Sequence, residues 1–319
     1  MTRIRDLDAL RGFAVCGIMV VNTWQHANDA VEEHTGTPID WVVENLLQSR
    51  FYPIFSFLFG VSFVLFLRSA ALRTPHPRLV TLRRLIVLAG LGALHEMVNP
   101  GEVLLPYAAT GVLLLLPASY VNRWLVLLAG IGATIWAMLA HAGGVWLVPG
   151  VILLGMAAMG FAPGPRVLKP AFITSGLLAV ALTGAWMYVW PPPETFDFPY
   201  TRSIYPLAGL VTATAYCTGV LLLRRWRPGT LSILEPLGRM ALTCYLSGTL
   251  VILATLPLLA ADDSRVSVVA VAMLTVAAQA AFSRWWLARF RYGPLEWGWR
   301  CLTWWEIVPN RHPRPALPG

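Results

Sequence analysis

The stretch from Gly90 to Tyr107 places four polar side chains between two long apolar runs. They are His95, Glu96, Asn99 and Glu102, and the turn formers Pro100 and Gly101 lie among them. An imidazole beside carboxylates is suited to general acid–base chemistry. In an apolar chain an ionisable group at membrane depth is a candidate for function, because burying it is costly. The alternative is a turn in the headgroup region, where His95 and Glu96 are solvated loop residues.

The composition of the whole chain is that of a polytopic membrane protein. Of its 319 residues, 57% are hydrophobic and 13% are charged, and the mean hydropathy is +0.62, above the range of soluble domains. A transmembrane helix needs about 20 mostly apolar residues. We therefore expect an all-α transmembrane helix bundle of about ten spans. The expected spans are 8–25, 51–68, 84–99, 103–121, 124–141, 145–162, 170–190, 204–223, 232–259 and 266–288.

The charges between these spans predict the orientation. Arginines gather before the first span and in every second connection, whereas most acidic residues lie in the other connections. Cytoplasmic loops carry the basic excess, so we expect an inner-membrane protein with both termini cytoplasmic. This orientation puts the His95 turn on the outer side with Asn22, His26, Arg50 and Tyr52. The cytoplasmic side collects Arg11, Arg83, Arg84 and Arg239.

Three segments outside the spans have patterns of their own. Residues 38–48 carry apolar side chains at helical spacing, which predicts an amphipathic helix on the outer membrane surface. Residues 293–310 are rich in Trp and Arg, as expected of a cytoplasmic interfacial helix. Residues 311–319 are expected to be a disordered tail. The chain thus divides into a bundle over 1–292, the interfacial helix and the tail.

Other classes of function are disfavoured by composition. The net charge of +8 reflects cytoplasmic loops, so no nucleic-acid partner is expected. The four cysteines form no C-x-x-C pair and the six histidines are scattered, so neither a disulfide framework nor a metal site is indicated. The expected partners are membrane lipids, and a homo-oligomer stays open.

Five blocks in a fixed order resemble one protein family. They are RDLDALRGFAVCGIMVVN at 5–22, RFYPIFSFLFGVSF at 50–63, GALHEMVNPGEVLLPYAATG at 92–111, EPLGRMALTCYLS at 235–247 and GPLEWGWRCLTW at 293–304. Together they are similar to the YeiB-like family of bacterial multi-pass membrane proteins. That family is grouped with the transmembrane acyltransferases, which include heparan-α-glucosaminide N-acetyltransferase and the O-acyltransferases of bacterial surface glycans.

The resemblance implies transfer of an acyl group from cytoplasmic acyl-CoA, as co-substrate, to a hydroxyl or amine of a small molecule or glycan on the opposite face. In the O-acyltransferase branch an Arg in the first helix is followed eleven residues later by a His. Here Arg11 is followed at that offset by Asn22, and an amide cannot act as a general base. Either His95 is then the base, as the His in the family's pattern allows, or acyl transfer is not the reaction of this branch. Glu102 matches the acidic residue that follows the hairpin glycine.

Acyl transfer from a thioester needs a base, a donor to the oxyanion and anchors for the CoA phosphates. On this hypothesis Glu102 or Glu96 orients the His95 ring, and Asn22 or Tyr52 donates to the oxyanion. The phosphates are bound by Arg11, Arg83, Arg84 and Arg239, each of which has an alternative role as a topogenic charge or a lipid contact. Further substrate contacts are predicted for His26, Arg50, Tyr52, Tyr107, Thr243 and Tyr245.

A second hypothesis is a transporter or flippase whose polar residues line a path for a small organic or lipid-like substrate. It predicts helices broken by Gly or Pro in two related halves, and several spans do contain a proline, at Pro53, Pro106, Pro149, Pro206 and Pro236. A non-catalytic scaffold ranks last, because it gains nothing from buried His and Glu. The sequence favours an acyltransferase and leaves the transporter open.

Overall fold

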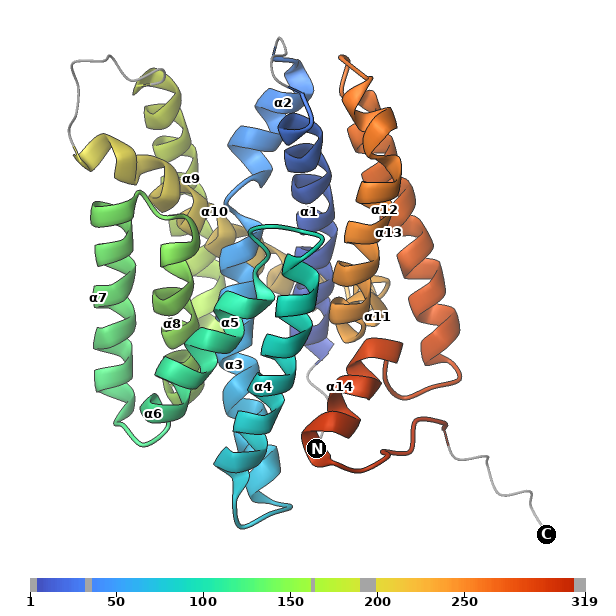
Figure 1. The fold of residues 1–319 in the computed structure, drawn as a ribbon. Coiled ribbons are helices and arrows are strands. Elements are labelled where there is room, and N and C mark those ends of the chain that lie inside the picture. Colours follow the sequence, from blue (N-terminus) through green and yellow to red (C-terminus); the bar gives the residue numbers. More distant parts are fainter. Residues whose placement is uncertain (1–4, 32–35, 162–163, 190–198, 313–319) are drawn as a thin grey trace.

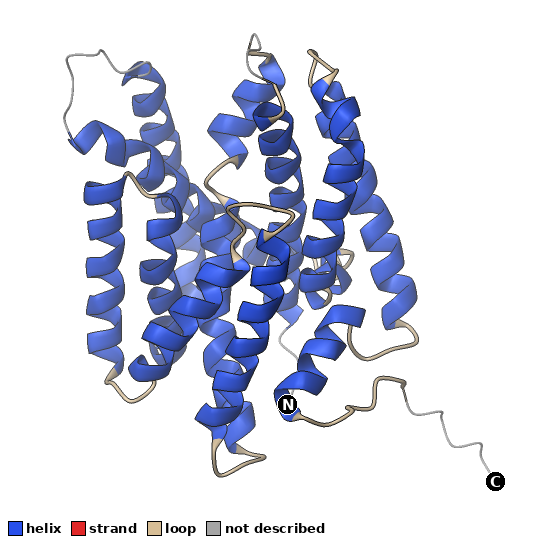
Figure 2. Cartoon of the chain, viewed as in Figure 1, coloured by secondary structure: helices blue, strands red, loops and turns tan. Residues whose placement is uncertain are grey.

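The computed structural model describes residues 5–31, 36–161, 164–189 and 199–312 as a bundle of helices (Figure 1). Within these ranges the regular secondary structure is helical and contains no strand (Figure 2). This confirms the prediction of an all-α polytopic bundle. The sequence predicts it because long apolar runs alternate with short polar connections, as a membrane bundle requires.

Eight helical segments in the described residues are long and apolar enough to cross a membrane. They are built from α1 (Arg5–Asp29), α2 (Pro38–Val42) with η1 (Val43–Leu47) and α3 (Phe51–Ala71), α7 (Arg123–His141), η3 (Gly144–Trp146) with α8 (Leu147–Phe161), η4 (Pro165–Val167) with α9 (Leu168–Val189), α10 (Pro199–Trp226), α12 (Ala241–Ala260) and α13 (Val266–Leu287). Successive spans run in alternating directions (Figure 1).

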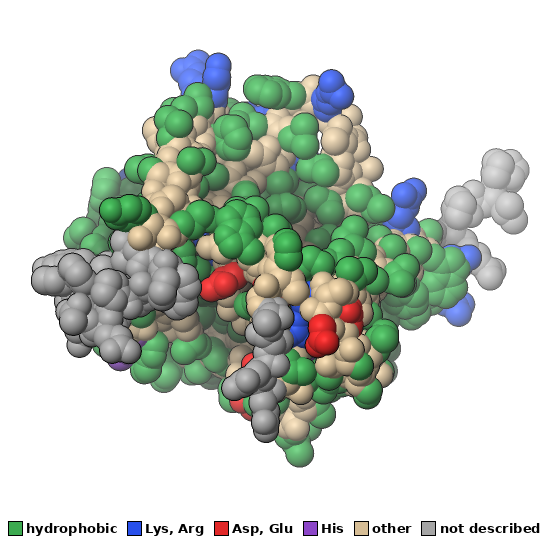
Figure 3. Space-filling model, turned by 90° about the horizontal axis from the view of Figure 1, so that it is seen from above, with side chains coloured by type: hydrophobic (Ala, Val, Ile, Leu, Met, Phe, Trp, Pro, Cys, Tyr) green, Lys and Arg blue, Asp and Glu red, His purple; other side chains and the backbone are tan. Residues whose placement is uncertain are grey.

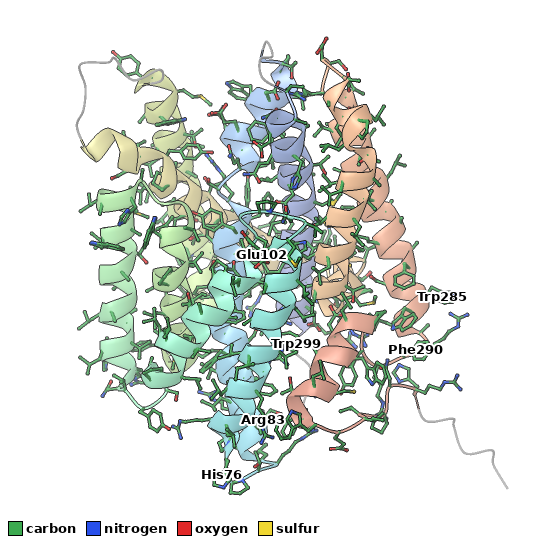
Figure 4. All side chains as sticks on the ribbon, in the orientation of Figure 1. His76, Arg83, Glu102, Trp285, Phe290 and Trp299 are labelled. Atoms are coloured by element: carbon green, nitrogen blue, oxygen red, sulfur yellow. The ribbon has the colours of Figure 1, made fainter. Side chains whose placement is uncertain are left out.

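The other two expected spans form a hairpin that does not cross the bundle. Its first arm is α4 (Pro77–Glu96), and its second arm is α5 (Leu104–Thr110), η2 (Gly111–Leu115) and α6 (Leu116–Ala118). Both arms start and finish at the end of the bundle where α1 begins, and the turn between them lies at mid-height, as the position of Glu102 shows (Figures 1 and 4). The turn is therefore not at the outer end, where the charge pattern had placed it: α4 begins level with the end of α3, at the lowest point of the view, and it finishes at mid-height (Figure 1).

Glycines allow two pairs of helices to cross in backbone contact. A Cβ on Gly12 of α1 would collide with the carbonyl oxygen of Leu234, and one on Gly238 in α11 (Leu234–Arg239) would collide with that of Asp8. Gly60 of α3 and Gly155 of α8 face each other in the same way. Close approach through small residues is the usual means of helix association in membranes.

The two ends of the bundle differ in charge. The basic end, where α1 begins and α3 and α10 finish, carries Arg5, Arg68 and Arg225. The opposite, acidic end carries Asp29, Asp262 and Asp263. Viewed onto the acidic end, hydrophobic side chains surround the acidic ones (Figure 3). An apolar girdle between charged ends is the surface that a bilayer requires.

Helix α14 (Pro294–Trp304) lies at the basic end beside α4 (Figure 1). The Trp299 indole Nε1 donates to the carbonyl oxygen of Arg84 at 2.9 Å. The Glu296 carboxylate accepts from the backbone N–H of Leu242 at 2.8 Å and of Thr243 at 3.0 Å, so it caps the N-terminus of α12.

The segments predicted outside the spans are present in part. Residues 38–47 form α2 and η1, so the expected outer helix exists, and it packs against the bundle through the buried Val43. Arg311, at the start of the expected tail, forms an antiparallel bridge with Phe290. Residues 313–319 of that tail lie outside the described residues.

Candidate functional site

The turn between α4 and α5 is held by its two carboxylates. The Glu96 side chain accepts from the backbone N–H of Gly101 at 3.0 Å and of Glu102 at 3.2 Å. The Glu102 side chain accepts from Leu104 at 2.7 Å and Leu105 at 2.5 Å, so it caps the first turn of α5. Negative groups are favoured at a helix N-terminus because they satisfy free N–H groups and oppose the helix dipole.

Two glycines make this turn possible. Gly101 has a φ of +82°, in the region that other residues rarely adopt. On α4, a Cβ added to Gly92 would lie 2.6 Å from the Leu105 nitrogen and 2.9 Å from Glu102 Oε1. The absence of a side chain at Gly92 therefore lets the capped end of α5 approach α4.

His95 lies between this carboxylate and a hydroxyl from a distant helix. Its Nδ1 is 3.4 Å from Glu102 Oε2, and its Nε2 is 3.0 Å from Thr249 Oγ1 on α12. All three residues are buried, with exposed fractions of 4% for His95, 3% for Glu102 and 2% for Thr249. Because a carboxylate accepts, Nδ1 carries the proton and Nε2 is left as the acceptor for the Thr249 hydroxyl.

A small cavity adjoins Thr249 between α1, α12 and α13. Its volume is about 20 Å³, room for about one water. The wall is mostly apolar and includes Met19 and Phe55, and its polar members are Asn22, Tyr245, Thr249 and Gln279. Thr249 therefore has His95 on one side and the cavity on the other.

Gln279, which lines this cavity, carries a buried acceptor without a partner. Its Nε2 donates to the Cys244 carbonyl oxygen at 2.8 Å and to Ser247 Oγ at 3.1 Å. Its Oε1 is buried and has no hydrogen-bond partner among the residues that the structure describes. A buried acceptor without a donor is costly, so this oxygen favours a bound group that carries an N–H or O–H.

Comparison with known proteins gives the family. A family model described as "Protein of unknown function (DUF418)" matches residues 162–306. A protein of Bacillus acidopullulyticus, described as an uncharacterized 39.9 kDa protein in the amylase 3′ region, is 32% identical over an alignment of 329 positions, which covers 94% of this chain and 94% of that protein. The chain belongs to the DUF418 family. DUF418 is the YeiB-like family, so the resemblance carried by the five sequence blocks is confirmed at that level.

In this DUF418 protein the structure brings together four of the residues predicted for the site. His95 contacts Glu102, and its ring centroid lies 5.1 Å from that of Tyr245. Tyr245 and Asn22 both line the cavity. Of the two carboxylates proposed to orient the ring, Glu102 makes the contact, whereas Glu96 binds the backbone of the turn.

The other predicted substrate contacts lie elsewhere in the DUF418 bundle. His26 Nδ1 is 2.9 Å from the Asn22 carbonyl oxygen, so it bonds within α1. The Tyr107 hydroxyl donates to the Tyr52 carbonyl oxygen at 3.2 Å, which ties α5 to α3. The Thr243 hydroxyl donates to Glu296 Oε2 at 2.6 Å at the basic end. None of these side chains is part of the cavity wall.

Arg50 is fully buried at the start of α3. It donates through Nη1 to the carbonyl oxygens of Gln48 at 2.5 Å and Glu44 at 3.3 Å, and its guanidinium lies 5.0 Å from the ring centroid of Tyr205. A cation at the C-terminal carbonyls of a helix is favourable. Arg50 thus closes the end of η1 and does not reach the His95 cluster.

The arginines predicted to bind phosphate lie towards the basic end. The Arg84 guanidinium lies 3.6 Å from the ring centroid of Trp299, and it is close enough to Arg11 and Arg300 for their charges to repel. Arg11 itself pairs with the Asp8 carboxylate at 3.1 Å and donates to Ser62 Oγ at 2.6 Å. Arg83, labelled in Figure 4, lies on Trp305 at 3.9 Å, and Arg239 donates to the Arg291 carbonyl oxygen at 3.0 Å.

Sequence reasoning missed Thr249 and Gln279. Both lie in long apolar helices, and Thr249 is 154 residues away from His95. The available signal was the spacing of Tyr245 and Thr249, which lie four residues apart and therefore on one face of α12.

Proposed function

We propose that this DUF418 protein is an integral-membrane acyltransferase that moves an acyl group from acyl-CoA to a hydroxyl or amine. The observation that supports this most is the placement of His95 between the Glu102 carboxylate and the Thr249 hydroxyl. A base held by a carboxylate at one nitrogen and touching a hydroxyl with the other is the arrangement that activates an oxygen nucleophile.

His95 acts as the general base in this proposal. An acceptor hydroxyl placed where Thr249 Oγ1 now lies gives its proton to Nε2 as its oxygen bonds to the thioester carbonyl carbon. The C–S bond then breaks, and the imidazolium returns the proton to the departing CoA sulfur. Glu102 holds the ring in the required tautomer and stabilises the positive charge that forms on it.

The oxyanion is stabilised from the cavity wall. Asn22 lines the cavity that Thr249 borders, so we assign its amide N–H₂ as the donor to the carbonyl oxygen that develops charge. Tyr52, the other candidate donor, is not part of that wall. The substitution of Asn for the His of the O-acyltransferase branch thus leaves a donor at this position while His95 supplies the base.

The donor is an elongated molecule with phosphates at one end. Arg84 and His95 lie eleven residues apart on α4, which is about 16 Å along a helix axis. A ligand whose phosphates meet Arg84, Arg11 and Arg300 must therefore extend along α4 for its acyl group to reach His95. Acyl-CoA has this form, and Arg is suited to bidentate phosphate contact.

The proposal includes an orientation of the protein in the membrane. We place the basic end, with the start of α1 and with α14, in the cytoplasm of the bacterial cell, since cytoplasmic ends carry the arginine excess. Acyl-CoA then enters from the cytoplasmic end, and the acceptor is a small molecule or glycan at the membrane or its outer face. Membrane lipids cover the apolar flanks.

The mid-height turn also supports a second candidate, a transporter or flippase. Helices that end inside the bundle and meet at a polar turn are typical of transporter binding sites, and α4 and α5 meet in this way (Figure 1). In that case the same buried His95 and Glu102 bind a transported organic molecule rather than activate an acceptor.

Calorimetry with acetyl-CoA and longer acyl-CoAs on the detergent-purified protein tests the proposal. We expect binding by the parent and by His95→Gln, and loss of binding in Arg84→Gln. Arg123→Gln is the matched control, because Arg123 also lies at the basic end on an aromatic ring, that of Phe161. If the parent binds no acyl-CoA, the acyltransferase proposal is contradicted, and transport of lipids and small organic molecules is tested next.

A further inference from the structure

The Thr249 hydroxyl makes a different contact from the hydroxyls of three other threonines in the spans. Thr23, Thr134 and Thr255 donate to the carbonyl oxygen four residues earlier at 2.7, 2.7 and 2.8 Å. The corresponding distance from Thr249 Oγ1 to the Tyr245 carbonyl oxygen is 3.5 Å, whereas its distance to His95 Nε2 is 3.0 Å. Thr249 is thus bonded mainly to the histidine and only weakly to its own helix.

This contact occupies the nitrogen that the proposed reaction needs. Because Nδ1 faces Glu102, Nε2 is the one ring nitrogen left to take a proton, and the Thr249 hydroxyl already lies against it. An acceptor hydroxyl reaches Nε2 only if Thr249 moves aside. The simpler course is that the hydroxyl in place reacts first.

The surroundings of Thr249 suit such a reaction. Nucleophile, base and orienting carboxylate follow one another at 3.0 Å and 3.4 Å, the order found in hydroxyl-based acyl transfer. The cavity that Thr249 borders is also lined by Asn22 and by Gln279, whose buried Oε1 has no hydrogen-bond partner among the described residues. Its volume of about 20 Å³ admits one hydroxyl or amine group beside Thr249.

We infer that Thr249 is the first acceptor of the acyl group, so that transfer occurs in two steps through an ester on its hydroxyl. This inference rests on the proposed function. It assigns Thr249 as a catalytic residue and the cavity beside it as the site of the second acceptor's hydroxyl or amine, with Gln279 Oε1 accepting a hydrogen bond from that group.

The two steps balance. In the first, Thr249 gives its proton to His95 Nε2, its oxygen bonds to the thioester carbonyl carbon, the C–S bond breaks, and CoA leaves as the thiol with the proton from His95. In the second, the acceptor gives a proton to His95, its oxygen or nitrogen bonds to the same carbon, the bond to Thr249 breaks, and Thr249 regains the proton. The sum is acyl-CoA plus acceptor yielding acylated acceptor plus CoA.

The test is incubation of the full-length purified protein with acetyl-CoA and no acceptor, followed by an acid quench. Intact-protein mass spectrometry and peptide mapping detect the adduct, thiol titration detects released CoA, and calorimetry measures binding separately. We expect one acetyl group per chain, on the peptide that holds Thr249, and one equivalent of thiol in the first turnover. Thr249→Ser keeps both signals, whereas Thr249→Val and His95→Gln lose both but still bind acetyl-CoA.

Thr255→Val is the matched control, since Thr255 lies on the same helix and bonds to its own backbone; it keeps the adduct. An adduct that persists in Thr249→Val, or that maps to another residue, overturns the inference. Bound acetyl-CoA with neither adduct nor acceptor-free thiol release overturns it as well, while leaving direct transfer and the proposed function standing. Failure of the parent to bind acetyl-CoA is the separate result that removes the proposed function itself.

Discussion

His95 and Thr249, 154 residues apart in the chain, meet inside the bundle with Nε2 and Oγ1 3.0 Å apart. The contact joins the α4–α5 hairpin to α12, and it lies beside Glu102, which Figure 4 shows at mid-height of the bundle. A buried imidazole whose two nitrogens are both engaged by protein groups has a defined tautomer and orientation. A defined tautomer and orientation are what a general base requires.

Glu102→Gln should abolish the acid–base chemistry while leaving the fold in place. The amide oxygen still accepts one N–H at the start of α5, but the group no longer stabilises a positive imidazole ring. We expect acyl-CoA-dependent thiol release to fall by about 10²- to 10⁴-fold, with acetyl-CoA binding unchanged. The control is Glu96→Gln, which alters the same turn without touching the ring and should keep most of the activity. Equal losses in both variants would argue against an orienting role for Glu102.

Gly92→Ala should damage both stability and the site. Its Cβ would lie 2.6 Å from the Leu105 nitrogen, so α5 must shift and carry Glu102 away from His95. We expect a loss of about 1–3 kcal/mol in unfolding free energy, seen as a lower melting temperature in detergent. Gly90→Ala, on the same helix with no atom within 4 Å of its Cβ, should be neutral or stabilising by up to ~1 kcal/mol. A Gly92→Ala protein as stable and active as the parent would contradict the packing described for the hairpin.

The spans and part of the site could be predicted from the sequence alone. The run of apolar segments identified the spans, because length and hydropathy are local properties, and the cost of burying ionisable groups singled out His95 and Glu102. The depth of the α4–α5 turn within the bundle could not be predicted in this way, because it is not determined by the local sequence. It depends on where α4 begins relative to its neighbours, and the charges of Arg83 and Arg84 indicate an end of the bundle without giving that offset.

Partners across the bundle were also beyond sequence reasoning. Thr249 is one threonine among several in apolar helices, and its significance comes from a contact with a residue 154 positions away. Thr243 and Arg50 were expected to meet substrate, but Thr243 bonds to Glu296 and Arg50 to the end of η1. A polar side chain in an apolar run signals a buried partner without saying whether that partner is a ligand or the protein itself.

Glu296 should make stability fall as pH rises. Burial raises the pKa of the Glu296 carboxyl above its usual 4.5, so the folded state holds this proton more tightly than the unfolded state. Its contribution is therefore fully present below the unfolded pKa and is lost as pH rises through the folded pKa. We expect the melting temperature of the parent to decline from about pH 4.5 upwards. Glu296→Gln should flatten this pH dependence of the melting temperature. The control is Glu306→Gln, which changes an exposed residue in the segment after α14 and should leave the dependence intact. Identical pH curves for all three proteins would contradict this role of Glu296.

The central claim is that His95 is the base of an acyl-CoA-dependent transfer. The most direct test measures thiol release from acetyl-CoA by the purified protein, with native membrane extract added as the source of acceptor. The parent should release CoA over repeated turnovers, and His95→Gln should release it at least about 10²-fold more slowly while binding acetyl-CoA with unchanged affinity. Equal rates for parent and variant, or no release by the parent despite bound acetyl-CoA, would contradict the account.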